Sequence, residues 1–306
     1  MFHKIINDDS SNILDIWKER ELPKINFCIN SPPYWNMLRR ALDYRGQGTR
    51  SQLRRLDKNL DTHYSEDKRD LGNISNYNMF IDELSKIYFD IYNIMKSGCY
   101  LVIVIQNIVK GNKVYPLTFD LTSKLKEKFI YMGEIMNIMD HKPLYVFGYP
   151  TQFGMNNCHH YCLIFRKKGK IKRQKIEYDK RYIDMGERGK YDNHNTLNDL
   201  TGKEWIKFTK SWKIYNNKPR SKKAILHPAT FSEKLVKDFV LFFTKKEDVV
   251  LDPFLGSGTT SIVCKMLSRN SIGIELSKRY YEISKERLNK TKVLDLSYKP
   301  RNKSMF

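Results

Sequence analysis

The sequence has few cysteines, no long apolar run and fewer acidic than basic residues. Its five cysteines are an odd, sparse set in 306 residues, which excludes a disulfide framework and indicates reduced thiols in a cytosol-like compartment. The most apolar run, residues 99–105, has the length of a strand and is too short to span a membrane. The first twelve residues lack the basic-then-apolar order of a signal peptide. We therefore expect neither a secreted nor a membrane-spanning protein.

The shortage of acidic residues makes the chain strongly basic. Its 34 Asp and Glu residues are outnumbered by 55 Lys and Arg, which gives a net charge of +21 and a pI near 9.6. Such a surface favours a polyanionic partner, either nucleic acid or an anionic membrane. The hydrophobic fraction of 41% is enough to build a packed core. The basic residues are concentrated in two stretches with little apolar periodicity, residues 36–76 and 166–223.

Outside these stretches, strand-like and helix-like segments alternate along the chain. Runs rich in β-branched and aromatic residues predict strands at 25–30, 99–105, 160–165, 249–251 and 271–274. Apolar residues at three- and four-residue steps predict helices at 81–95, 232–243 and 260–267, and a helix followed by a strand between 117 and 139. The first of these helices is expected to end at Ser97-Gly98. This alternation predicts an α/β fold with a parallel, doubly wound sheet.

A glycine turn with an acidic partner is the first chemical signal. A buried strand runs into Asp252, and Gly256-Ser257-Gly258 then turns the chain into a helix. Glycines let a ligand approach the backbone, and the start of a helix offers unpaired N–H groups. Glu275 follows the next strand, where a carboxylate can accept hydrogen bonds from both hydroxyls of a ribose. Because no Gly-Lys-Ser/Thr follows, the pattern predicts an adenosine-bearing cofactor and not a triphosphate.

The tetrapeptide Ser31-Pro32-Pro33-Tyr34 is the second signal, again at the end of a strand. Two prolines fix the backbone, so the Ser31 hydroxyl and the Pro32 carbonyl can accept the two hydrogens of an exocyclic amine. Tyr34 offers a flat face on which a flipped-out base can stack.

Together these motifs resemble the amino-group DNA methyltransferases that use S-adenosylmethionine, specifically the permuted β group of restriction-modification enzymes. In that group the catalytic motif precedes the cofactor motif, as it does here. Residues 227–231 (HPATF) look like the group's HPA-x-F motif, and residues 71–77 and 273–288 fit two further segments. Residues 5–10 are similar to the opening strand, with Asp8 in place of a glycine and Asp9 at the matched acid. The resemblance does not extend to the two basic regions.

The resemblance implies a circularly permuted, Rossmann-like α/β methyltransferase fold with a small inserted target-recognition region. The catalytic half would be residues 1–166, the recognition region 167–222, the cofactor-binding half 223–291 and a basic tail 292–306. S-adenosylmethionine is the implied cofactor. The implied catalytic residues are Ser31, Pro32, Pro33 and Tyr34. The implied cofactor-binding residues are Asp9, Phe231, Asp252, Pro253, Phe254, Gly256, Ser257, Gly258, Thr259 and Glu275.

The resemblance also implies methyl transfer to the exocyclic amine of a base flipped out of double-stranded DNA, in a prokaryotic, cytoplasmic, DNA-associated enzyme. Within the family, Ser before Pro-Pro-Tyr mostly accompanies cytosine N(4) methylation, and Asp or Asn adenine N(6) methylation. We therefore expect a site-specific cytosine-N(4) enzyme of a restriction-modification system, with adenine N(6) as the alternative. A separately encoded endonuclease is expected, and a homodimer is left open. Candidate DNA contacts are Arg39, Arg40, Arg45, Arg173, Lys175, Arg181, Arg188 and Lys190.

Other interpretations are less favoured. A catalytically inactive nucleic-acid-binding module would keep the fold, but the intact Ser31, Tyr34, Gly256 and Glu275 argue against it. RNA methyltransferases with a Pro-Pro-Tyr motif usually place it after the cofactor motif. Residues 158–162 (CHHYC) crowd four metal-ligand types into five residues, which cannot all surround one ion. We expect a strand there with alternating buried positions, and no metal.

Overall fold

The computed structural model describes residues 1–35, 67–110, 113–140, 142–146, 149–151, 153–169, 195–215 and 232–293. The strands are β1 His3–Asn7, β2 Ile25–Asn30, β3 Met95–Ile105, β4 Ile108–Lys110, β5 Lys113–Tyr115, β6 Ile130–Ile138, β7 His159–Arg166, β8 Trp212–Ile214, β9 Val249–Asp252 and β10 Asn270–Glu275. The α-helices are α1 Ile13–Glu19, α4 Tyr77–Ile94, α5 Leu117–Leu125, α6 Gly202–Phe208, α7 Glu233–Phe243, α8 Thr259–Met266 and α9 Lys278–Lys290. Two 3₁₀ turns, η1 Ser10–Asn12 and η2 Leu71–Asn73, complete the set.

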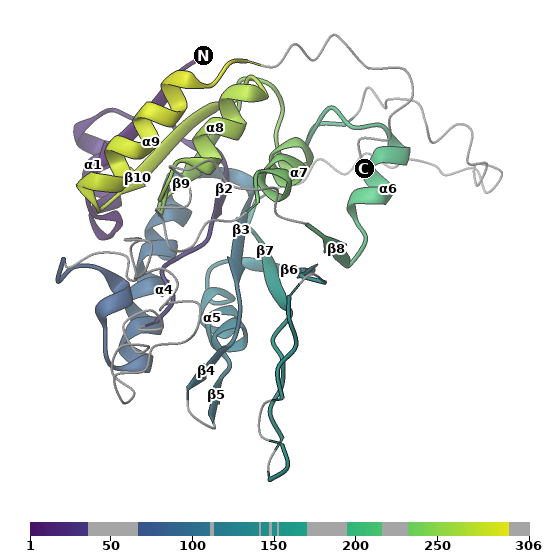
Figure 1. The fold of residues 1–306 in the computed structure, drawn as a ribbon. Helices are drawn as coiled ribbons and strands as arrows, with labels where there is room; N and C mark the ends of the chain where they lie inside the picture. Colours follow the sequence, from purple (N-terminus) through teal and green to yellow (C-terminus); the bar gives the residue numbers. More distant parts are fainter. Residues whose placement is uncertain are drawn as a thin grey trace.

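A central sheet carries helices on both faces (Figure 1). Its strand order is β1-β10-β9-β2-β3-β7-β6-β8, and β4 pairs with β5 in a separate ribbon. Helices α1, α4 and α5 bury their apolar sides on one face, with Phe80, Leu84 and Leu121 fully covered. Helices α7 and α8 cover the other face. Over the described ranges, no helix is both long and apolar enough to cross a bilayer.

The order of strands reverses between β9 and β2. From β2 the chain proceeds outward to β3, and from β9 it proceeds the other way to β10. Strands β2 and β9 are parallel neighbours, with Cys28 opposite Leu251. The Ser-Pro-Pro-Tyr segment and the glycine turn therefore leave adjacent strands at the same edge, although they lie far apart in the sequence. In open α/β sheets, ligands bind at such a reversal.

The structure confirms the α/β fold class and the predicted strand at Ile25–Asn30, but the sheet is mixed and not wholly parallel. Strand β7 runs antiparallel to both β3 and β6, because it returns from β6 without a crossover helix. The expected helix end at Ser97-Gly98 is wrong: α4 ends at Ile94 and β3 begins at Met95. The pairing of β2 with β3 shifts register between Met95 and Tyr100. Gly98, at φ +77°, lies in this irregularity, where positive φ favours glycine.

Part of the region expected to be an insertion, residues 195–215, is built into the core. Strand β8 pairs in parallel with β6, with Trp212 opposite Met136. Phe208 of α6 stacks on Phe242 of α7, with ring centroids 3.8 Å apart. The sequence held a signal for α6 that the periodicity did not reveal: Thr201 and Glu204 form a capping box at its start.

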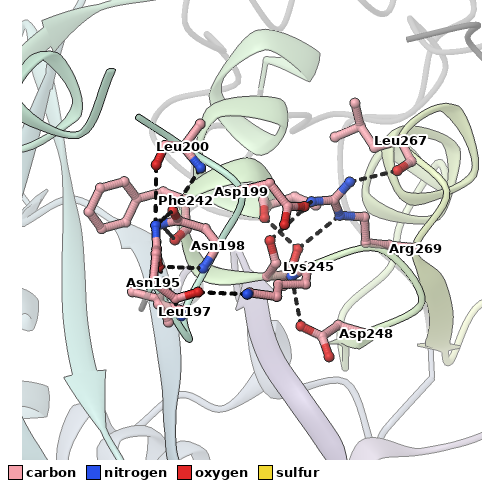
Figure 2. Close-up of polar contacts among 12 residues, drawn as sticks. Asn195, Leu197, Asn198, Asp199, Leu200, Phe242, Lys245, Asp248, Leu267 and Arg269 are labelled. Atoms are coloured by element: carbon pink, nitrogen blue, oxygen red, sulfur yellow. Dashed lines mark hydrogen bonds and ion pairs between the residues drawn. The ribbon is translucent and has the colours of Figure 1, made fainter. Parts of the chain in front are cut away.

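A polar network fastens residues 195–200 to the end of α7 and to the turn that follows it (Figure 2). The Asn198 amide donates to the Phe242 carbonyl at 2.6 Å, and the Lys245 ammonium donates to the Asn195 carbonyl at 2.6 Å. Arg269, whose side chain is 2% exposed, donates to the carbonyls of Thr244 and Leu267, at 3.0 and 2.7 Å. This network lies at the amino ends of β9 and β10, the edge opposite the reversal site.

Arg269→Ala is expected to destabilise the fold by about 3 kcal/mol, because it leaves buried carbonyl groups without donors. Urea unfolding followed by circular dichroism measures the change. Asp199→Asn is the matched variant, because Asp199 is the ion-pair partner of Arg269 at 3.6 Å. The Asp199 side chain is 51% exposed. This variant should cost less than about 1 kcal/mol. Arg269 is expected to stabilise the fold mainly through its hydrogen bonds to buried carbonyls. Equal losses of unfolding free energy in the two variants would show instead that the ion pair with Asp199 is responsible.

Candidate active site

A pocket opens at the carboxyl ends of β1, β2, β9 and β10. Its empty space, which includes the open solvent at its mouth, is about 830 Å³. The predicted cofactor and catalytic segments supply many of its walls. Nine residues singled out from the sequence line it: Asp9, Ser31, Pro33, Pro253, Phe254, Gly256, Ser257, Thr259 and Glu275.

The glycine turn is shaped by two residues in the left-handed backbone region, Gly256 at φ +55° and Gly258 at φ +87°. Gly258 does not line the pocket. A Cβ atom there would lie 2.9 Å from the Ser284 Cβ, so this glycine allows the turn to pack closely on α9. Arg287 of α9 donates to the Ser257 carbonyl and, at 3.1 Å, to the Ser257 hydroxyl. The turn is therefore held from behind while its front faces the pocket.

Glu275 lies in the pocket wall with its carboxylate held by backbone donors. The Gly256 N–H donates to one oxygen at 2.7 Å and the Ser277 N–H to the other at 2.9 Å. Burial raises the pKa of Glu275 to about 7, and these two hydrogen bonds oppose the rise. Each oxygen accepts one backbone bond, so each keeps a second lone pair for a ligand hydroxyl.

Asp252 lies beneath the turn and not in the pocket lining. The Thr260 hydroxyl donates to one oxygen at 2.5 Å and the Phe254 N–H to the other at 3.0 Å. Its side chain is buried, and burial raises the pKa of Asp252 to about 7. The carboxyl thus ties the end of β9 to α8 and sets the shape of the turn. Its predicted place in the cofactor site is an indirect one in this geometry.

The end of β1 is joined to the glycine turn. The Ser10 hydroxyl donates to the Pro253 carbonyl, and the Asp8 N–H donates to the Glu275 carbonyl at 3.2 Å. Asp9 caps η1 by accepting the Ser11 N–H at 2.9 Å, and its side chain reaches the pocket. The opening strand and the glycine turn therefore form one continuous wall.

Ser31 lines the same pocket from the β2 side, whereas Tyr34 lies behind it. Burial raises the pKa of Tyr34 well above its ordinary value, and the neighbouring Ser31 side chain opposes the rise. Tyr34 is 6% exposed and does not line the pocket. Its ring must therefore be uncovered before it can stack on a base. Beneath Ser31, the buried Asn30 accepts the Tyr88 hydroxyl at 2.7 Å.

The pocket also contains charged residues that the sequence did not assign to the site, Arg69 and Asp70. Asp70 is 5% exposed and accepts a hydrogen bond from the Gly72 N–H at 2.9 Å. Its charge lies close enough to Glu275 to help raise the pKa of Glu275. Arg69 pairs with Asp67 at 2.6 Å. The capping of η2 by Asp70, two residues before a glycine, was the signal available in the sequence.

At residues 158–162 a strand forms as predicted, with β7 beginning at His159, but the expected alternation is wrong: His159, His160 and Tyr161 are all half-buried and Cys162 is buried. His160 and Cys162 lie in β7, and burial lowers the pKa of His160 to about 4 and raises that of Cys162 to about 12. Across the residues that the structure describes, no three His, Cys, Asp or Glu side chains gather in a way that could hold a metal ion.

Several predicted residues lie outside the described residues. These are Phe231 and the eight candidate DNA contacts Arg39, Arg40, Arg45, Arg173, Lys175, Arg181, Arg188 and Lys190. Their assignments stay predictions.

Comparisons with known proteins agree with this geometry. The chain matches the N6_N4_Mtase family, described as DNA methylase, over residues 25–286. It is 30% identical to the orphan methyltransferase M.BamHII of Bacillus amyloliquefaciens over 237 residues, which cover 74% of this chain and 86% of the relative. It is 27% identical to the type II methyltransferase M.MjaI of Methanocaldococcus jannaschii over 94% of this chain and 91% of the relative.

Solved structures share the fold. A DNA modification methylase of Thermus thermophilus, TTHA0409, solved with S-adenosylmethionine, superposes with a TM-score of 0.59 at 22% identity, over 97% of this chain and 99% of its own. The PvuII cytosine-N4-specific DNA methyltransferase gives 0.63 at 15% identity, over 94% and 86%. The family match and the aligned relatives lead to one conclusion: this chain belongs to the N6_N4_Mtase family of DNA methylases, which use S-adenosylmethionine to methylate an amino group of a base.

Proposed function

We propose that the protein methylates the exocyclic N(4) amine of a cytosine flipped out of double-stranded DNA. The observation that carries this proposal is the position of Ser31, which lines the pocket that the glycine turn and Glu275 also form. The choice of cytosine rests on serine before Pro-Pro-Tyr, the residue that mostly accompanies N(4) methylation in the family. The PvuII enzyme of the same fold carries this specificity by name.

The pocket residues fit S-adenosylmethionine, which supplies the methyl group. Glu275 keeps one lone pair on each oxygen for the two ribose hydroxyls. Asp9 lies just after β1 in the pocket wall, where its carboxylate can accept a hydrogen bond from the adenine amine. Asp70 adds a buried carboxyl that suits the ammonium of the amino-acid end. The buried Asp252 contributes by fixing the turn on which Gly256 and Ser257 lie.

Ser31 and Pro32 would prepare the amine for attack. The lone pair of an exocyclic amine is delocalised into the ring, which makes it a poor nucleophile. Hydrogen bonds from the amine to the Ser31 hydroxyl and the Pro32 carbonyl would localise that pair and direct it at the methyl group. Such positioning supplies catalysis through orientation and fixed charge, with no covalent enzyme intermediate.

The cysteines of the chain support amine chemistry over methylation of a ring carbon. All five lie in the described ranges, and none is among the side chains that line the pocket. Burial raises the pKa of Cys28, the cysteine nearest Ser31 in sequence, well above its ordinary value. A neutral, buried thiol cannot attack a base.

The predicted partners remain part of the proposal. A base can reach Ser31 only if the DNA lies along the edge where the pocket opens, and the eight basic residues named from the sequence are proposed to contact it. A homodimer and a separately encoded endonuclease stay predictions.

Incubation with labelled S-adenosylmethionine and mixed genomic DNA, followed by nucleoside digestion and mass spectrometry, tests the choice of base. We expect labelled N(4)-methylcytosine. N(6)-methyladenine would leave the fold and the amine chemistry in place but overturn the choice of cytosine. Retained cofactor binding without any transfer to DNA would overturn the proposal and favour an RNA substrate, which the same assay with mixed RNA measures.

A further inference from the structure

The ribbon formed by β4 and β5 lies beside the pocket edge. It follows β3 after two residues, and β3 is the parallel neighbour of β2, with Ile103 opposite Asn30. The ribbon therefore emerges at the edge where Ser31 follows β2 (Figure 1). Lys110 and Lys113 are paired across it. Between Gln106 and Phe119 the sequence has no acidic residue, so the ribbon carries two positive charges and no negative one.

Three aromatic rings join this ribbon to the catalytic tetrapeptide. Trp35, which directly follows Tyr34, lies 5.0 Å from the Tyr77 ring and 4.7 Å from the Tyr115 ring, and these two rings are 5.0 Å apart. Each such pair contributes about 0.5–1.5 kcal/mol beyond area burial. Trp35 is 2% exposed, and its indole N–H donates to the Ser75 carbonyl at 3.2 Å. We call Trp35, Tyr77 and Tyr115 the aromatic cage.

The two lysines of the ribbon lie over the cage. The Lys110 ammonium is 5.0 Å from the centre of the Trp35 ring, and the Lys113 ammonium is 5.3 Å from that of Tyr115. Both side chains are exposed. The ion pairs found within the described ranges involve neither of them. Both ammonium groups therefore lie over rings of the cage that adjoins the tetrapeptide, and they remain open to a ligand.

We infer that Lys110 and Lys113 bind phosphates of the DNA strand next to the base that enters the pocket. Lysine binds phosphate as a point charge, and phosphate contacts fix the register of a protein on DNA. The cage joins the ribbon that carries both lysines to Trp35, which follows the tetrapeptide. DNA bound at the ribbon would therefore have a defined position relative to Ser31. The inference rests on the DNA substrate of the family and not on which base is methylated.

DNA affinity over a salt series tests this site. The double variant Lys110→Ala/Lys113→Ala is compared with the wild type by fluorescence anisotropy on a labelled, mixed-sequence duplex. Loss of two phosphate contacts should reduce the slope of log K against log salt by about 1.8. The matched control Lys24→Ala/Lys246→Ala removes the same charge from two exposed lysines at the amino ends of β2 and β9, and should leave the slope unchanged. S-adenosylmethionine affinity, measured in parallel, reports whether the pocket is intact.

An unchanged slope in the ribbon variant, or an equal loss in the control, would overturn the inference without touching the choice of base. A second variant tests the link to the tetrapeptide. Tyr115→Leu keeps both lysines but removes one ring of the cage, so kcat should fall about tenfold while DNA affinity changes little. Tyr115→Phe, which keeps the ring, should retain wild-type kcat. A loss of DNA affinity with unchanged kcat in Tyr115→Leu would contradict the positioning role.

Discussion

Ser31→Ala is expected to lower kcat by about 10²–10³-fold while leaving the affinity for S-adenosylmethionine unchanged. Ser31 lines the pocket from the β2 side, whereas the proposed cofactor contacts come from the ends of β1, β9 and β10 and from Asp70 at the start of η2. The hydroxyl acts on the amine only as the methyl group is transferred, and loss of one such preorganised group costs about this factor in rate. Single-turnover transfer of labelled methyl groups to DNA measures the effect, and calorimetry measures cofactor binding.

A matched variant separates chemistry from local structure. The Ser31 side chain neighbours the Tyr34 hydroxyl. Tyr34→Phe removes this hydroxyl but keeps the ring and the Ser31 hydroxyl, so we expect it to retain most of the wild-type kcat. If Tyr34→Phe lost as much activity as Ser31→Ala, the serine would act by holding the tyrosine and not by contacting the amine. If Ser31→Ala were fully active, the proposed role of Ser31 would be wrong.

The sequence predicted best those features that depend on neighbouring residues. The strand Ile25–Asn30 was placed correctly, because a β-branched run is stopped by two prolines that cannot donate to a ladder. Strand β9, the glycine turn and α8 were also predicted, since Gly256 and Gly258 mark the turn by their backbone freedom. The resemblance to a family supplied the link between the two motifs.

The sequence predicted poorly those features that depend on contacts between distant segments. Nothing near His159–Arg166 reveals that this strand runs antiparallel to its neighbours, since direction is set by the path of the chain between strands. Gly98 appeared to end a helix, but it lies where the pairing of β2 with β3 shifts. Residues 202–214 are short, basic segments that are joined to the core by contacts with α7 and β6, which lie elsewhere in the sequence.

The same distinction applies to the candidate site. Nine predicted residues line one pocket because they follow neighbouring strands at the reversal of the sheet. Asp252 and Gly258 are conspicuous in sequence for a different reason, since they shape the turn from behind. Asp70 was missed because an acid before a glycine indicates a local cap in the sequence, and only the fold places that cap opposite Glu275.

Glu275→Gln is expected to weaken S-adenosylmethionine binding by about 100-fold, the second large effect. Two hydroxyl bonds to a charged acceptor are replaced by bonds to a neutral one, and each charged bond is worth about 1.5–3 kcal/mol. In the wild type, the N–H groups of Gly256 and Ser277 donate to the two carboxylate oxygens. In Glu275→Gln the amide nitrogen replaces one of these acceptors, so one hydrogen bond is lost and two donors face each other. Calorimetry at pH 8 measures the loss.

The pH dependence of binding gives this assignment a sharper test. Burial raises the pKa of Glu275 to about 7, so the carboxyl is largely protonated at pH 6 and ionised at pH 8. Ribose hydroxyls donate to the ionised form, and wild-type affinity should therefore fall as the pH is lowered from 8 to 6. Glu275→Gln should lose this dependence. Asp252, whose pKa burial also raises to about 7, is unchanged in this variant and ionises over the same pH range.

The stability of the free protein should change in the opposite direction. A carboxyl whose pKa is higher in the folded than in the unfolded state binds more protons when folded, so its contribution favours folding at low pH and declines as the pH rises toward 7. Thermal melting of wild type and Glu275→Gln between pH 5 and 8 measures this contribution without cofactor. If Glu275 must ionise to bind the ribose, the affinity for S-adenosylmethionine rises with pH. Over the same pH range, the contribution of Glu275 to the stability of the free protein falls. Parallel trends would show that Glu275 is structural and that the ribose lies elsewhere.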